Sequence, residues 1–307
     1  MDIKKINFLS FLILGGFILF LNVQIFNQIK KENFQELHYF YHNGGSICYE
    51  VKGIGRAIVF VHGGNMDSRI WDDQFNVFAE SNRVIRYDVR GFGKSDLPQQ
   101  PFSHVEDLDC LLDHLHVEKA VFVGLSLGSR IIIDFSLVHP EKVEALICAG
   151  PGLSGYPFPQ ESNKRIWKII ETARDRDSKK AAEMWLDDPY MKPAMENSRI
   201  KERISQIVFQ NAHIWLLNPL LERPIKPSAY ERITDIKIPI LTIVGEKDVK
   251  EILSIADLLA SRVPGAKKRV MAGAGHIINM EDPQEFNRVV ADFLKSCLKK
   301  NSDRSAR

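Results

Sequence analysis

Residues 120–133 read Ala-Val-Phe-Val-Gly-Leu-Ser-Leu-Gly-Ser-Arg-Ile-Ile-Ile. The first four form a continuous apolar run, which is typical of a parallel strand covered on both faces. The last residues begin a stretch with helical periodicity that continues to His139. Between the two lies Gly-x-Ser-x-Gly, which predicts a tight strand-to-helix turn that projects the hydroxyl of Ser126 above the sheet edge. Gly124 and Gly128 suit this turn, because side chains on either flank of the serine would clash.

The same alternation of apolar and helical stretches extends in both directions from this turn. Strand-like runs occur at residues 46–51, 57–61, 83–87, 145–148, 240–244 and 268–271. Helical periodicity lies between them, at residues 71–80, 105–115, 127–139, 252–259 and 286–298. Strands that alternate with helices predict an α/β fold with a mostly parallel sheet and helices on both faces.

One long stretch interrupts the alternation. Residues 155–232 contain no convincing buried strand and are rich in charged, aromatic and proline residues. Because this stretch falls between two sheet strands, we expect a helical insertion on a core formed by residues 46–154 and 233–300. Trp167, Trp185 and Trp215 are candidates to line a pocket in it, although aromatics at helical spacing usually pack against one another.

A second motif, His62-Gly63-Gly64, follows directly after the strand predicted at residues 57–61. A loop at this place can supply a backbone amide that faces the serine. We assign this amide to Gly64 and a partner amide to Leu127, the residue after the serine. Two such donors stabilise the oxyanion of an acyl-transfer intermediate. The alternative is a plain glycine turn.

Two further motifs supply an acid and a base. Asp248 lies in Gly-Glu-Lys-Asp at the carboxyl end of the strand predicted at residues 240–244, where it could orient a histidine. Glu246 is a possible substitute. His276 ends Gly-Ala-Gly-His after the last predicted strand. Asp282 is a predicted helix N-cap that fixes the far end of this loop.

The three residues occur in the order Ser126, Asp248, His276, which is the order of the hydrolase triad. This chemistry requires no metal ion and no organic cofactor. The four cysteines form no C-x-x-C pair and have no metal-ligand spacing. Forty-one Lys and Arg against 39 Asp and Glu give a net charge of +2, so nothing indicates a nucleic-acid partner.

Together these motifs resemble the α/β-hydrolase superfamily over residues 46–298. Residues 88–95 look like its D-x-R-G-x-G-x-S turn, to which the resemblance gives a structural role. Gly275-His276 followed by Glu281-Asp282-Pro283 is similar to its G-H-x-x-x-x-E-x-P pattern. Residues 151–155 resemble the start of the helical lid in enol-lactonase-like and carbon–carbon bond hydrolase-like members. The resemblance implies an α/β-hydrolase fold in which residues 155–232 form the lid.

The resemblance also implies a serine hydrolase that cleaves a small carboxylic ester or lactone by two-step acyl transfer. Haloalkane dehalogenases and epoxide hydrolases are disfavoured, because they place Asp where Ser126 stands. Carbon–carbon bond hydrolysis or perhydrolysis at the same triad remains an alternative. So do a ligand-sensing protein that retains the triad and a membrane-tethered scaffold with an inert hydrolase domain.

The first 31 residues form a separate segment. An apolar run at residues 6–26 lies between Lys4-Lys5 and Lys30-Lys31 and is long enough to cross a bilayer as a helix. It predicts a single uncleaved membrane anchor, with the catalytic domain outside the cytoplasm and residues 32–45 as a linker. A cleaved signal peptide, which would give a secreted protein, is the alternative.

Overall fold

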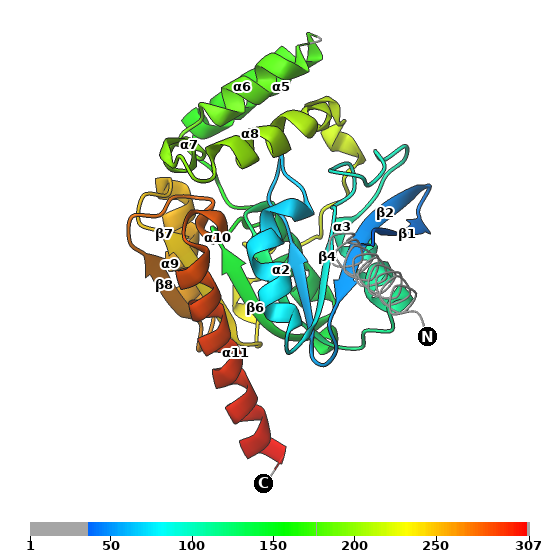
Figure 1. Ribbon diagram of the computed structural model, residues 1–307, viewed down its shortest axis with the longest axis vertical. Coiled ribbons are helices and arrows are strands. Elements are labelled where there is room, and N and C mark those ends of the chain that lie inside the picture. Colours follow the sequence, from blue (N-terminus) through cyan, green and yellow to red (C-terminus); the bar gives the residue numbers. More distant parts are fainter. Residues whose placement is uncertain (1–35, 176, 306–307) are drawn as a thin grey trace, which may run out of the picture. The chain divides into compact units, whose positions relative to one another are not determined.

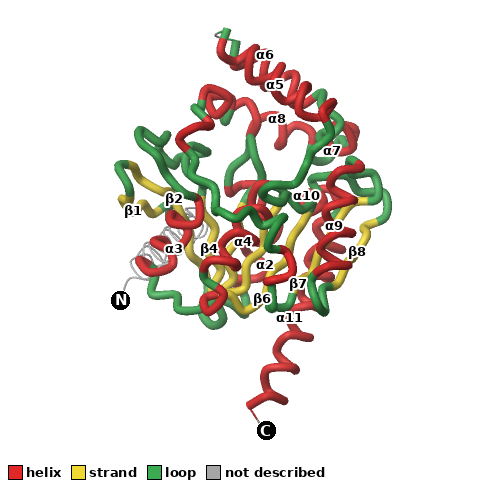
Figure 2. Tube along the Cα trace, turned by 180° about the vertical axis from the view of Figure 1, so that it is seen from behind, coloured by secondary structure: helices red, strands yellow, loops and turns green. Residues whose placement is uncertain are grey.

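An eight-stranded β-sheet lies at the centre of this computed structural model, which describes residues 36–175 and 177–305 (Figures 1 and 2). The strand order is β1-β2-β4-β3-β5-β6-β7-β8. β1 and β2 pair antiparallel at one edge, and the pairs from β4 to β8 are all parallel. The strands are β1 His38–His42, β2 Gly45–Lys52, β3 Ala57–Val61, β4 Arg83–Tyr87, β5 Ala120–Leu125, β6 Val143–Ala149, β7 Ile240–Gly245 and β8 Lys267–Met271. The α/β fold predicted from the sequence is therefore confirmed.

Strand β1 lies inside residues 32–45, which the sequence analysis predicts to be a linker. It is an edge strand that buries only one side: Phe40 is buried, whereas Tyr39 and Tyr41 are exposed. A single buried residue between exposed ones gives no apolar run, so periodicity does not reveal it. The sheet thus begins before residue 46.

The core helices confirm the predicted helical stretches within three residues at each end, except that the last one ends at Ser305 rather than at residue 298, and the short helix at Ile278–Glu281 was not predicted. They are α2 Asp72–Ala79, α3 His104–His114, α4 Leu127–Val138, α9 Lys250–Arg262, α10 Ile278–Glu281 and α11 Pro283–Ser305. Short 3-10 turns occur at η1 Ser68–Trp71, η2 Pro140–Lys142 and η5 Ile233–Asp235. Asp282 caps α11 as predicted, since its Oδ1 accepts a hydrogen bond from the amide of Glu285 at 3.1 Å.

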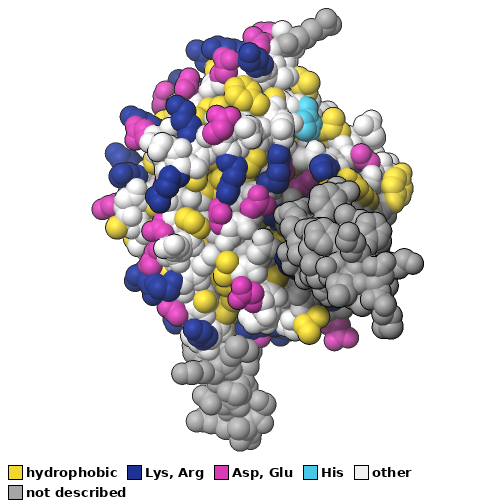
Figure 3. All heavy atoms as spheres, in the orientation of Figure 1, with side chains coloured by type: hydrophobic (Ala, Val, Ile, Leu, Met, Phe, Trp, Pro, Cys, Tyr) yellow, Lys and Arg dark blue, Asp and Glu magenta, His cyan; other side chains and the backbone are white. Residues whose placement is uncertain are grey.

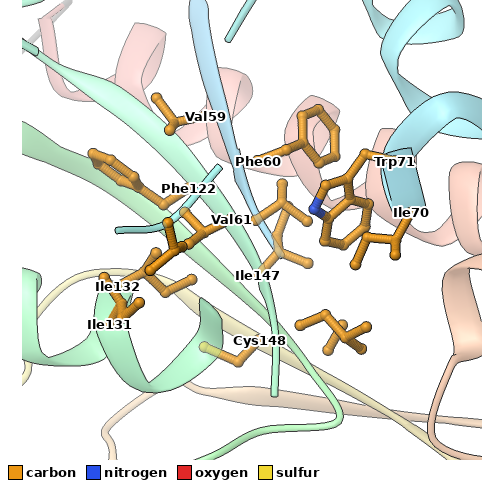
Figure 4. Close-up of a cluster of buried hydrophobic side chains, with 14 of the residues drawn as sticks. Val59, Phe60, Val61, Ile70, Trp71, Phe122, Ile131, Ile132, Ile147 and Cys148 are labelled. Carbon is orange, nitrogen blue, oxygen red and sulfur yellow. The ribbon is translucent and has the colours of Figure 1, made fainter. Parts of the chain in front are cut away.

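The helices cover both faces of the sheet, as the packing of β3 and β5 shows (Figure 4). Phe60 of β3 contacts Trp71, with ring centroids 5.0 Å apart, on the α2 side. Val59 points to the opposite face, because neighbouring strand residues alternate. It lies beside Phe122 of β5, whose ring packs 5.2 Å from Phe135 of α4. Strand β3 is therefore buried along its whole length, as its continuous apolar run predicts.

The insertion forms a helical lid, which Figure 1 shows at the opposite end of the core from the last turns of α11. It contains α5 Gln160–Arg174, α6 Ser178–Leu186, α7 Lys192–Glu196, α8 Lys201–Gln210, η3 Ala212–Leu216 and η4 Pro219–Leu221. On one side Asn211 binds the core, donating to Asp67 at 2.8 Å and accepting from the amide of Gly93 at 2.7 Å. On the other side Ser162 donates to Glu251 of α9 at 2.6 Å. These elements all lie within residues 155–232.

Charges of both signs are interspersed on the surface. On the described part of the face drawn in Figure 3, Lys and Arg side chains alternate with Asp and Glu. This mixture agrees with the small net charge of +2.

The predicted membrane localisation requires correction. No helix within residues 36–175 and 177–305 is long and apolar enough to cross a bilayer. The segment of residues 1–31 on which the prediction depended lies outside the described residues.

The turn between β5 and α4 has the tight geometry expected from Gly-x-Ser-x-Gly. Ser126 has φ 54° and ψ −109°, in a region that non-glycine residues rarely occupy. A Cβ atom at Gly128 would lie 2.1 Å from the carbonyl oxygen of Val61, and one at Gly124 would lie 2.4 Å from the backbone of Gly128. Only glycine fits at these two positions, because the opposing atoms belong to the backbone.

Replacing Gly128 with alanine should lower the free energy of unfolding by about 3 kcal/mol or more, since β3 and α4 would have to separate. Gly265→Ala is the matched control. Gly265 has φ +76° and open space around it, so only the backbone conformation costs about 1–2 kcal/mol. Urea denaturation of both variants measures the difference, and equal losses would show that the close approach is not the cause.

Candidate active site

Ser126 is held at the start of α4 by backbone hydrogen bonds. Its amide donates to the carbonyl of Ala149 at the end of β6, at 2.9 Å. Its own carbonyl accepts from the amides of Arg130 at 3.1 Å and Gly152 at 3.2 Å. The strained φ angle is thus fixed by contacts to the helix and to the neighbouring strand.

Gly64 and Leu127 lie next to each other, as the predicted pair of oxyanion donors requires. A Cβ atom at Gly64 would lie 4.0 Å from Cβ and Cδ2 of Leu127. Leu127 is the first residue of α4, so its amide is among the four that have no acceptor within the helix. The dipole of α4 also favours negative charge at this end.

His62 fixes the conformation of the Gly63-Gly64 loop. The amide of Val89 donates to Nε2 of His62 at 2.8 Å, so this nitrogen must be the unprotonated one. Nδ1 therefore carries the proton and donates to the carbonyl of Gly63 at 2.8 Å. Burial lowers the pKa of His62 despite the nearby negative charge of Asp88, which keeps the imidazole neutral and this tautomer in place. No role for this side chain was predicted from the sequence.

Asp248 and His276 form a buried pair. Nδ1 of His276 lies 3.1 Å from Oδ1 and 3.0 Å from Oδ2 of Asp248. The side chain of Asp248 is fully buried and that of His276 is 3% exposed. Oδ1 of Asp248 also accepts from the amide of Val249 at 2.7 Å.

The electrostatic environment of His276 favours the imidazolium. Burial alone would lower the pKa of His276, but the negative charges of Asp248, Glu281 and Asp188 outweigh burial, so this pKa lies above its ordinary value. A carboxylate that contacts Nδ1 leaves Nε2 to exchange a proton with a reacting group.

The segment after β6 brings Ser126 and His276 to the same place. Ala149 and Gly152 both form backbone hydrogen bonds with Ser126. Gly150, between them, has φ +46°, and a Cβ atom there would lie 3.0 Å from Cε1 and Nδ1 of His276. Because β5, β6, β7 and β8 are neighbours in the sheet, the loops that carry Ser126, Asp248 and His276 leave the same edge.

Glu246, the alternative acid, points elsewhere. Its Oε2 accepts from the amide of Gly273 at 2.9 Å, in an exposed position. The described hydrogen bonds of His276 to an acid involve Asp248 only.

The lid contributes an aromatic side chain that the sequence analysis did not identify. The ring of Tyr190 lies 5.0 Å from the imidazole of His276 at an interplanar angle of 71°. Its hydroxyl is 3.5 Å from Oε1 of Glu251, the carboxylate that Ser162 also contacts. No local pattern reveals Tyr190, because its importance comes from the turn between α6 and α7 of the lid, which packs against a distant loop.

The three tryptophans that were candidates for a pocket lining have different environments. Trp167 is 51% exposed. Trp185 and Trp215 are buried and pack against each other, with ring centroids 5.9 Å apart. Trp185 also stacks on Tyr190 at 5.8 Å. A chain of aromatic contacts therefore runs from the lid interior to His276.

Two cavities of about 630 and 640 Å³ flank residues 224–225 at the end of the lid. Neither is lined by Ser126, Asp248 or His276, so we do not assign the substrate to them. Within the part of the chain that the structure describes, no three His, Cys, Asp or Glu side chains are grouped as metal ligands.

Comparison with known proteins agrees with this fold. Residues 58–289 match the model of the Alpha/beta hydrolase family. The chain is 28% identical over 263 residues to a 2-hydroxy-6-oxononadienedioate/2-hydroxy-6-oxononatrienedioate hydrolase of Paraburkholderia phymatum, covering 81% of this chain and 90% of that protein. It is 26% identical over 245 residues to 3-oxoadipate enol-lactonase 2 of Acinetobacter baylyi, covering 78% and 88%.

A solved structure of a hydrolase from Pseudomonas aeruginosa matches with a TM-score of 0.71 and 26% identity, covering 85% of this chain and 99% of that one. The family match extends over most of the chain and includes each predicted site residue. The chain therefore belongs to the alpha/beta hydrolase family and is a hydrolase.

Proposed function

We propose that this protein is a serine hydrolase that cleaves a small carboxylic ester or lactone by two-step acyl transfer. The observation that carries the proposal is the buried pair of His276 and Asp248 at 3.0–3.1 Å, on the same sheet edge as the strained turn of Ser126. Similarity to an enol-lactonase supports the substrate class.

In the first step His276 takes the proton of Ser126 as the hydroxyl oxygen attacks the carbonyl carbon of the substrate. Asp248 holds the imidazole in the required tautomer and stabilises its positive charge. The amides of Gly64 and Leu127 bind the developing oxyanion. His276 then protonates the leaving oxygen as its bond to the carbonyl carbon breaks and the acyl-enzyme forms; an ester releases a free alcohol, whereas an opened lactone keeps the hydroxyl on its acyl chain. In the second step His276 activates a water that releases the acid.

Carbon–carbon bond hydrolysis at the same residues is the second candidate, supported by the similarity to the P. phymatum hydrolase. A panel of short-chain esters and lactones, assayed beside a vinylogous diketone, separates the two. We expect kcat/KM to be highest within the ester and lactone set. Faster turnover of the diketone would reassign the reaction and leave the site residues unchanged.

Ser126→Ala should abolish both turnover and labelling by a fluorophosphonate, with a rate loss of about 10⁴-fold or more, because the triad acts as a unit. Labelling followed by mass spectrometry of the modified peptide checks this. A serine hydroxyl elsewhere is the nucleophile if the alanine variant still becomes labelled. Labelling of the wild-type enzyme without turnover of any substrate would favour a ligand-sensing protein.

Asp248→Asn should reduce kcat by about 10³- to 10⁴-fold while the fold persists, because the amide favours the wrong imidazole tautomer. Glu246→Gln is the matched control on the same loop and should leave kcat close to that of the wild type. Steady-state kinetics on the best substrate, with circular dichroism of both variants, tests the assignment. A larger loss from Glu246→Gln would identify Glu246 as the acid.

A further inference from the structure

The loop that carries His276 is short and lies between β8 and α10. Its imidazole has to stay aligned with Asp248 on one side and Ser126 on the other. Loops are more mobile than the elements they connect, and a small displacement of a catalytic group lowers the rate steeply. Some contact must therefore hold the backbone at residue 276.

The carboxylate of Glu281 makes this contact. Its Oε2 accepts from the amide of Gly275 at 2.7 Å, and its Oε1 accepts from the amide of Ile277 at 2.9 Å. Glu281 is 8% exposed, and both hydrogen bonds are buried. The two donors belong to the residues immediately before and after His276, so one side chain fixes the loop on both sides of the imidazole.

The lid packs against the same loop on its outer side. A Cβ atom at Gly275 would lie 2.5 Å from the ring of Pro193 of α7 and 3.2 Å from Oε1 of Glu281. There is thus no room at residue 275 for a side chain. The loop therefore lies between Pro193 of the lid and the carboxylate of Glu281, which accepts from the amide of Gly275.

Glu281 is also one of the charges that face His276. The others are Asp248 from the loop after β7 and Asp188 from the lid, and the Tyr190 ring packs against the imidazole. Burial raises the pKa of Glu281, while its two amide donors and the nearby His276 oppose this rise. When ionised, Glu281 stabilises the imidazolium form of His276.

We infer that Glu281 is a positioning residue, whose carboxylate holds His276 in place through the amides of Gly275 and Ile277. This role gives a function to the glutamate of the G-H-x-x-x-x-E-x-P pattern. The inference rests on the proposed function, in which His276 is the general base.

The test compares Glu281→Gln and Glu281→Asp with the wild-type enzyme. The readout is the second-order rate constant of fluorophosphonate labelling at Ser126, measured from about pH 5 to pH 9, which requires no known substrate. Glu246→Gln is the control, because Glu246 also binds an amide of this loop, that of Gly273, but at the surface. Thermal denaturation of each variant reports on its fold.

Glu281→Gln should label about 10- to 100-fold more slowly, since one amide loses its acceptor and faces an NH2 group. Labelling requires neutral His276, and the loss of a negative charge lowers the pKa of His276. The acid limb of the rate profile should therefore move to lower pH. Glu281→Asp keeps the charge but is too short to reach both amides, so the rate should fall with a smaller movement of the limb. Glu246→Gln should behave as the wild type.

A glutamine variant that labels at the wild-type rate with an unmoved acid limb overturns the inference, even if its thermal stability falls. If the glutamine variant does not fold, the aspartate variant decides. An aspartate variant that labels at the wild-type rate would also overturn the inference. Wild-type enzyme that fails to label at Ser126 overturns the proposed function itself. The two failures are distinct, because the second appears before any change at residue 281.

Discussion

The first turn of α4 lies so close to the end of β3 that the backbone at residue 128 almost touches the carbonyl of Val61. This close contact between α4 and β3 determines the position of two parts of the candidate site. It places Ser126 in a strained conformation at the top of the sheet, and it brings Leu127 beside Gly64. Such strain costs about 1–3 kcal/mol and persists only where the surroundings fix it. Here the hydrogen bonds from Ser126 to β6 and to α4 supply that restraint.

A second constraint is the cost of burying negative charge around His276. An ionised carboxylate in the interior is strongly destabilising unless donors surround it. Each of the three that face the imidazole has such donors. Asp248 has the amide of Val249, Glu281 has two loop amides, and Asp188 has the amide of Tyr190 and the guanidinium of Arg165. The carboxylates whose negative charges stabilise the imidazolium of His276 therefore also accept hydrogen bonds that hold the segments around it.

Most of the core and the candidate triad could be predicted from the sequence, because each depends on a local pattern. A strand buried on both faces must be continuously apolar, as residues 57–61 are, and a glycine-rich turn at a strand end indicates a site. Strand β1 gives no such signal, since Tyr39 and Tyr41 face solvent. Tyr190 and Glu251 were missed for a different reason: their roles depend on contacts between distant segments. The apolar segment at the N-terminus gave a strong local pattern, but the membrane localisation predicted from it required correction.

The bond between Ser162 and Glu251 has a consequence for how this architecture can diversify. Glu251 belongs to the core and follows Asp248 by three residues, yet its donors, Ser162 and Tyr190, belong to the lid. A lid grafted from another hydrolase without these two hydroxyls would leave a buried carboxylate without these donors, three residues from Asp248, the candidate acid. The lid of this protein is thus not an exchangeable module. Recombination that preserves the enzyme has to carry the first turn of α9 together with the lid.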